Sequence, residues 1–205
     1  MENGMSRALR FAAVAAALLF AVSVYAFGAA LEGYVQSMHP VSLLGAKGFP
    51  HAQAFNLVAL VVPGMLAGAV MLELRHRLPS TAGWLPRIGA QLAFLATLGF
   101  IAMGLLPLDP QDLESHGSRL HGTAWMLWCV SFISGAAMLG AGLSRLRGWA
   151  LFGQLTLVAM VGVLAAAFLL TGLLPAGEAQ RLAFALWFGW LVLAGSRYGS
   201  ETSPI

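Results

Sequence analysis

Charged residues are scarce in this chain, since Asp, Glu, Lys and Arg together make up 9% of its 205 residues. Soluble domains carry about 25%, so this sequence has too few charged side chains to cover a surface that faces water. Cysteine is almost absent as well. Cys129 stands alone, which excludes a disulfide framework and a paired-cysteine metal motif. The sequence also has no basic patch with interleaved aromatic residues, so we expect no nucleic-acid partner.

Apolar sequence fills the chain instead, because 59% of the residues are hydrophobic. A membrane-spanning helix needs about 20 consecutive apolar residues, and six segments approach or exceed that length. The alternating strands of about 10 residues that form a membrane barrel are missing. We therefore predict an all-α polytopic membrane protein, with residues 1–205 as a single transmembrane domain that contacts the lipid bilayer. Its six helices are expected at about 8–30, 53–74, 86–106, 120–143, 149–173 and 181–197.

The first segment has an alternative interpretation as a signal peptide. Arg7 and Arg10 precede it, and small residues near 26–30 resemble a cleavage site. The apolar part of a signal peptide is typically about 7 to 15 residues long. This segment is about twenty, which favours a retained first helix.

The basic residues predict the orientation. If six helices alternate, Lys47, Arg119 and Arg181 fall on one side and the other eight basic residues on the opposite side. Loops rich in Lys and Arg stay in the cytoplasm, so both termini are expected there. The eight residues on that side are Arg7, Arg10, Arg75, Arg77, Arg87, Arg145, Arg147 and Arg197.

A partial internal repeat suggests how the helices are grouped. The sequence Gly-Leu-Leu-Pro occurs at 104–107 and again at 172–175, and each copy precedes an Arg-Leu-x4-Trp-x2-Trp motif that starts at Arg119 or Arg181. Helices three and four therefore match helices five and six, and we predict three helical hairpins. Trp84, Trp125 and Trp187 are expected near helix ends, at the membrane interface.

Histidines and carboxylates gather in two loops on the side opposite the termini. Residues 32–52 contain His39 and His51 but remain apolar at Val41, Leu43, Leu44 and Phe49. Lipid cannot satisfy an irregular backbone, so this segment is expected to fold back over the helix bundle. The loop at 107–121 adds Asp109, His116 and His121.

Several motifs resemble one known family. They are His-Pro-Val-Ser-x-Leu-Gly from His39, a second helix with Pro63-Gly64, Gly-Leu-Leu-Pro-Leu-Asp from Gly104, and Arg-Leu-His from Arg119. Together they resemble the domain of unknown function 998. The resemblance implies a six-helix protein of the bacterial inner (plasma) membrane and brings no settled activity.

The loop residues leave three functions open. A catalytic zinc site takes three protein ligands and a water, so His39, His116 and His121 could hold a divalent metal such as zinc. Asp109 and Ser42 would then be catalytic residues in the hydrolysis of a lipid or amphipathic molecule. Paired histidines can also ligate haem, which would fit His51 and His121. The third possibility is a sensor, carrier or structural protein without chemistry. Ionisable groups are missing from the helix centres, which argues against a pump.

Overall fold

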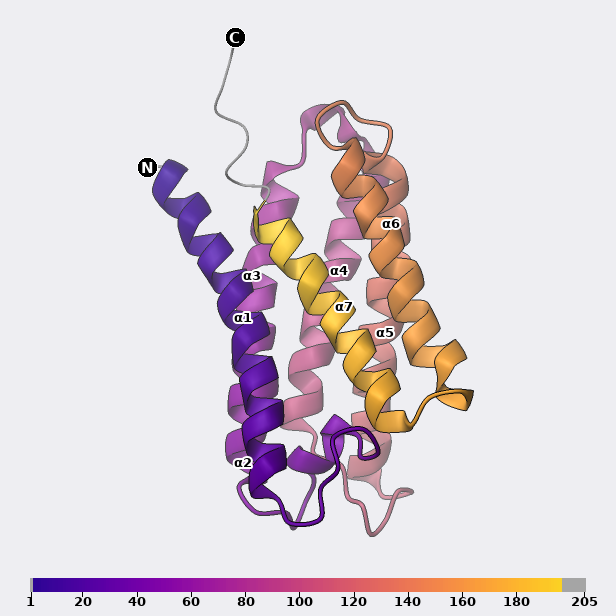
Figure 1. Cartoon of the computed structure of the whole chain (residues 1–205). Coiled ribbons are helices and arrows are strands. Elements are labelled where there is room, and N and C mark those ends of the chain that lie inside the picture. The colour runs from indigo at the N-terminus through magenta and orange to yellow at the C-terminus, as the bar shows by residue number, and fades with distance from the viewer. Residues whose placement is uncertain (1, 197–205) are drawn as a thin grey trace.

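The computed structural model describes residues 2–196 and is all-helical over that range, with no strand. Six long helical segments make up the bundle, and Figure 1 shows their arrangement. Two of them contain wider π-helical turns and continue through them. The segments are α1 (Glu2–Ala30), α2 (Ala52–Phe55) with η2 (Asn56–Val61) and α3 (Val62–Arg77), α4 (Trp84–Leu105), α5 (His116–Leu143), α6 (Ala150–Leu164) with η4 (Ala165–Leu169) and η5 (Leu170–Gly172), and α7 (Ala176–Ser196).

The predicted class, an all-α membrane protein, is confirmed. Within the described residues, five helices are long and apolar enough to cross a membrane: Arg7–Ala30, Ala52–Arg77, Trp84–Leu105, His116–Leu143 and Ala150–Gly172. The sixth, α7, is less apolar because it contains Gln180, Arg181 and two tryptophans. It corresponds to the segment predicted at 181–197, whose last residue, Arg197, lies outside the described residues.

Helices that follow each other in the chain pack side by side, and α7 returns to pack against α1. In Figure 1, α7 lies between α1 and α6. The tightest pair is α4 and α5, where glycines let the backbones touch. A Cβ on Gly99 would lie 2.7 Å from the backbone nitrogen of Trp128, and one on Gly135 would lie 2.8 Å from that of Ala93. This is the small-residue packing that brings membrane helices together.

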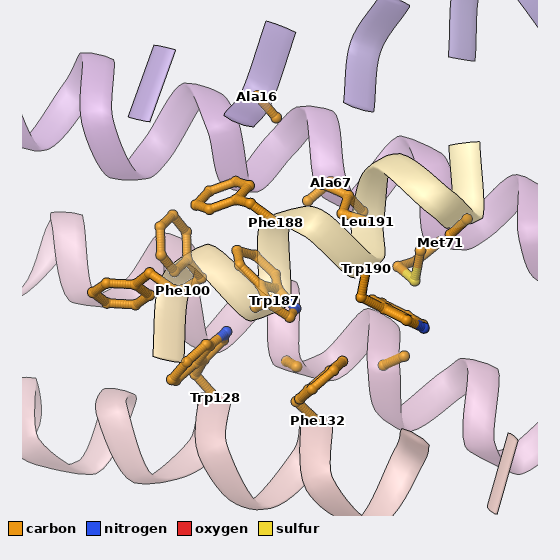
Figure 2. Close-up of a cluster of buried hydrophobic side chains, with 14 of the residues drawn as sticks. Ala16, Ala67, Met71, Phe100, Trp128, Phe132, Trp187, Phe188, Trp190 and Leu191 are labelled. Carbon is orange, nitrogen blue, oxygen red and sulfur yellow. The ribbon is translucent and has the colours of Figure 1, made fainter. Parts of the chain in front are cut away.

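Aromatic side chains of α7 fill the centre of the bundle. Trp187, Phe188 and Trp190 point inward, where Trp187 meets Phe100 of α4 and Trp128 of α5 (Figure 2). The prediction that Trp187 lies at the membrane interface is wrong, since its side chain is 0% exposed. The reason is the position of the helix start. Because α7 begins at Ala176, Trp187 lies about 16 Å along the axis at 1.5 Å per residue.

The connections α1–α2, α4–α5 and η5–α7 lie together at one end of the bundle, which we call the loop face (Figure 1). The first of these folds back over the helices, as predicted, because Val41 and Leu44 are buried with 1% and 2% of their surfaces exposed. Its short helix η1 (Val41–Gly45) is tied to α7 by the Val41 amide, which donates to Gln180 Oε1 at 2.7 Å. Lys47 N donates to Leu108 O at 2.8 Å and joins this loop to the next.

Candidate functional site at the loop face

Arg181, in the second turn of α7, is the centre of a polar cluster at the loop face. Its five N–H groups all have acceptors. Nε and Nη2 donate to Gln36 Oε1 at 3.2 and 2.7 Å, Nη2 to the Tyr34 hydroxyl at 2.6 Å, and Nη1 to the carbonyl oxygens of His39 and Gly177 at 2.9 and 2.8 Å. The guanidinium therefore fixes the turn after α1 against the start of α7.

The charge of Arg181 is held in place but not neutralised. All its acceptors are neutral, and no carboxylate of residues 7–196 forms an ion pair with it within 4.0 Å. The matching arginine of the sequence repeat is different, since Arg119 Nη2 lies 2.9 Å from Glu114 Oε2. The connection before α7 is shorter, and the one acidic residue near Arg181, Glu178 in the first turn of α7, is exposed and makes no such pair within the described residues. A half-buried positive charge without a counter-ion attracts an anion.

Burial keeps the neighbouring phenol in its neutral form. The pKa of Tyr34 is raised because burial disfavours the phenolate, and this effect outweighs the attraction and hydrogen bond of Arg181, which lower it. The Tyr34 hydroxyl donates to the carbonyl oxygen of Pro40 at 3.2 Å or to that of His39 at 3.3 Å. The cluster therefore keeps a net positive charge.

An apolar groove of about 290 Å³ runs between α1 and α7, and Arg181 lies among the residues that line it. Small and apolar side chains make up its walls. Those from α1 include Ala17, Ala21 and Tyr25, and those from α7 include Ala185, Gly189 and Val192. A Cβ on Gly189 would meet no atom within 4 Å, so the groove is open at this point.

The predicted site residues belong to two neighbourhoods of the loop face. His39 lies beside the Arg181 cluster, where its Nδ1 accepts from Val35 N at 2.9 Å and its ring centroid is 5.4 Å from that of Tyr34. Ser42 lies nearby in η1 and is half-buried. Neither side chain contacts a carboxylate within the described hydrogen bonds and ion pairs.

The other three predicted residues lie around the α4–α5 connection. His121 is 9% exposed, and its Nδ1 is 2.8 Å from Leu106 O. Asp109 Oδ1 accepts from Gln111 N at 3.2 Å, and Oδ2 lies 3.9 Å from Lys47 Nζ. His116 is exposed at the first residue of α5.

No group of three or more His, Cys, Asp or Glu side chains is placed to hold a metal ion within residues 7–196. The set of His39, His116 and His121 with Asp109 therefore gains no support as a metal site. The residues that the sequence reasoning missed are Arg181, Tyr34 and Gln36. The sequence carries no clear signal for them, because Glu178 lies three residues before Arg181 and would be the expected partner of its charge.

The fold and the loop face define a multi-pass helical membrane protein. The sequence model of one family, described as "Protein of unknown function (DUF998)", matches residues 14–197. The chain belongs to this family, as its motifs indicated. No curated protein and no solved structure matches the chain.

Proposed function

We propose that all six helical segments cross the plasma membrane, as three hairpins, with both termini in the cytoplasm. The start of α1 and the end of α7 lie at the same end of the bundle (Figure 1). The helix ends and turns that carry the arginines from Arg7 to Arg147, apart from Arg119, lie there too. Lys47, Arg119 and Arg181 lie at the loop face, which is then extracytoplasmic by the positive-inside rule.

We infer that the protein binds an anionic amphipathic molecule, with the membrane lipids as its source, and catalyses no reaction on it. The observation that carries this proposal is the charge of Arg181, which has no acidic partner among the described residues and lies at the loop-face end of an apolar groove. An acyl chain fits the apolar walls, and a phosphate or carboxylate headgroup complements the guanidinium. This proposal therefore favours a sensor or carrier over an enzyme.

The dimensions of the groove support one acyl chain. Arg181 and Val192 are the two ends of its α7 wall, and eleven residues of helix measure about 16 Å. The hydrocarbon core of a bilayer is about 30 Å thick, so the groove extends over about one leaflet. A lipid of the outer leaflet can place its chain along Gly189 and its headgroup at the depth of Arg181.

The charge predicts which lipids are preferred. The guanidinium hydrogen-bonds to neutral groups only, so the headgroup is selected by charge and not by a bidentate hydrogen bond. Each basic residue near an anionic membrane surface contributes about 1 kcal/mol, which is about fivefold in affinity. We therefore expect phosphatidylglycerol to bind with about fivefold higher affinity than phosphatidylcholine.

The metal-dependent hydrolase stays a prediction with less support. Hydrolysis by a metal needs converging ligands and an open position for water. The described residues hold no such cluster, and Ser42 makes no hydrogen bond to Asp109 or to a histidine. The haem alternative, with His51 and His121 as ligands, also stays untested.

The test fills the groove without touching the core. Gly189→Phe places a ring in the open groove, whereas Gly122→Phe is a matched control, since Gly122 is also an exposed helical glycine with no atom within 4 Å of its Cβ. Each purified protein is mixed with equal amounts of phosphatidylglycerol and phosphatidylcholine, and bound lipid is counted by native mass spectrometry.

We expect the wild type and Gly122→Phe to retain phosphatidylglycerol preferentially, and Gly189→Phe to lose it. Arg181→Gln should retain lipid without the preference for the anionic headgroup. Equal retention by Gly189→Phe and Gly122→Phe, or a wild type without preference, would show that this groove is not the binding site.

A further inference from the structure

A second cavity of about 390 Å³ lies at the loop face, and its lining is more polar than that of the groove. Its walls come from the end of the first loop, the start of the helix Ala52–Arg77 and Pro107. Four side chains give it its chemistry: Lys47, His51, Gln53 and Asn56. Its volume falls within the range of small-molecule sites, at the lower end. None of the residues that line it is acidic.

Lys47 is held at the rim by its backbone while its ammonium group remains available. Its amide nitrogen donates to Leu108 O at 2.8 Å, which fixes the position of the residue. Its Nζ lies 3.9 Å from Asp109 Oδ2, and its side chain is 50% exposed. This distance is beyond hydrogen-bond range, so Asp109 attracts the ammonium but occupies none of its N–H groups.

His51 lines the same cavity in a strained backbone conformation. Its φ of 58° makes it the one non-glycine residue with positive φ in the described part of the chain. Glycine adopts this left-handed conformation freely, whereas a residue with a Cβ is disfavoured. Strain of this kind concentrates at ligand sites, where the side chain has a role. Here the strained residue contributes an imidazole to the wall of the cavity.

Asn56 anchors the inner wall. It is 7% exposed, and its Nδ2 donates to Gly45 O at 2.9 Å. It also begins the π-helical turn Asn56–Val61, a feature found frequently at functional sites. Pro63, which has no N–H to offer the preceding turn, accounts for the widening itself. The consequence is an inner wall with a fixed amide.

We propose that this cavity binds a small anion that carries a carboxylate or phosphate group, with the Lys47 ammonium and the His51 imidazole on its oxygen atoms. Gln53 provides an amide on the neighbouring helix turn. The anion has two possible sources, a free solute outside the membrane or the headgroup of an anionic lipid. Both present the same oxygen atoms to Lys47 and His51. The site is independent of the groove, since the two share no lining residue.

The chain offers an unusually clean probe, because Lys47 is its only lysine. A membrane-impermeant acylating reagent modifies Lys47, and peptide mass analysis separates that product from the modified N-terminus. The acylation rate is measured with inorganic phosphate, with succinate, and with choline chloride as the control salt. A parallel series uses nanodiscs of phosphatidylglycerol or of phosphatidylcholine without added anion.

Binding should slow the acylation of Lys47 about tenfold at a probe concentration ten times its Kd, whereas choline chloride leaves it unchanged. Protection by phosphate or succinate identifies a free anion, and protection in phosphatidylglycerol nanodiscs alone identifies a lipid headgroup. If none of these conditions changes the rate, the proposal is wrong.

Substitution of His51 separates binding from folding. His51→Gly removes the backbone strain, so its thermal stability should equal or exceed that of the wild type, yet protection of Lys47 should be lost. His116→Ala is the matched control, because His116 is an exposed histidine of the same face that does not line the cavity. Full protection of Lys47 in His51→Gly would overturn the role of His51.

Discussion

Nη2 of Arg181 lies 2.6 Å from the hydroxyl oxygen of Tyr34, although 147 residues separate the two in the chain. The pair joins the turn after α1 to the start of α7, at the loop-face end of the groove between these helices. Burial raises the pKa of Tyr34 more than Arg181 lowers it, so the phenol does not become the missing counter-ion. The geometry that fixes Arg181 therefore also preserves its net charge for a ligand.

Arg181→Lys should destabilise the protein although it keeps the charge. Lysine has three N–H donors and no planar fork, so it cannot replace the contacts with Gln36, Tyr34, His39 and Gly177. Hydrogen bonds to charged groups contribute about 1.5 to 3 kcal/mol, and we expect a loss of about 2 to 3 kcal/mol. Unfolding in mixed detergent micelles measures it. Arg119→Lys, at an exposed ion pair, should change stability by less than about 0.5 kcal/mol; similar effects at both positions would contradict the argument.

The helical class of the protein was predictable from the sequence, and the site was not. Segment length and charge content decide a membrane fold because the bilayer sets both. Segment length and charge content could not predict the partners of Arg181, because Tyr34 and Gln36 become its neighbours only when α7 packs against α1. The predicted helix also began at residue 181, whereas α7 begins at Ala176, and this difference moved Trp187 into the core.

For the histidines, the sequence predicted the position in the fold but not the direction of the ring. The sequence predicted that His39 and His121 lie in or beside loops of one face, and in the structure His39 lies in the α1–α2 connection and His121 near the start of α5. The direction of each ring depends on local hydrogen bonds that spacing does not encode. His39 Nδ1 faces Val35 N, and His121 Nδ1 faces Leu106 O.

Gly99→Leu should disrupt the packing of α4 on α5. A Cβ at this position would lie 2.7 Å from the backbone nitrogen of Trp128, and a backbone cannot move aside as a side chain can. Overpacking of this kind costs about 1 to 3 kcal/mol, which detergent unfolding can measure. A Cβ on Gly122 would meet no atom within 4 Å, so the stability of Gly122→Leu should be unchanged or higher by up to about 1 kcal/mol. Equal stability of the two variants would be inconsistent with this interface.

Cysteine labelling should reproduce the burial pattern of the first loop. Cysteines at positions 41 and 44 replace buried side chains, whereas those at 35 and 38 replace side chains that are 49% and 58% exposed. A membrane-impermeant maleimide should label the second pair rapidly and the first pair slowly. Cys129 is buried and contributes little background. Rapid labelling at all four positions would mean that the loop extends into water.

Thr156→Val should measure how much a hydrogen bond inside the bundle contributes to the free energy of unfolding. Trp190 Nε1 donates to Thr156 Oγ1 at 3.0 Å, and both side chains are buried. The matching tryptophan of the sequence repeat, Trp128, has a buried Nε1 without a partner among the described residues, so the repeat does not extend to this bond. Valine keeps the shape of threonine and removes both this acceptor and the bond that the Thr156 hydroxyl donates to Phe152 O at 2.7 Å.

Hydrogen bonds between membrane helices contribute about 0.6 kcal/mol on average and up to about 1.7 kcal/mol, and we expect Thr156→Val to cost an amount in this range. A double-mutant cycle with Trp190→Phe isolates the bond from the change in packing. With phenylalanine at 190 there is no N–H to leave unpaired, so the cost of Thr156→Val should fall to that of the bond between the Thr156 hydroxyl and Phe152 O alone. Additive effects of the two substitutions on the free energy of unfolding would show that this contact contributes nothing.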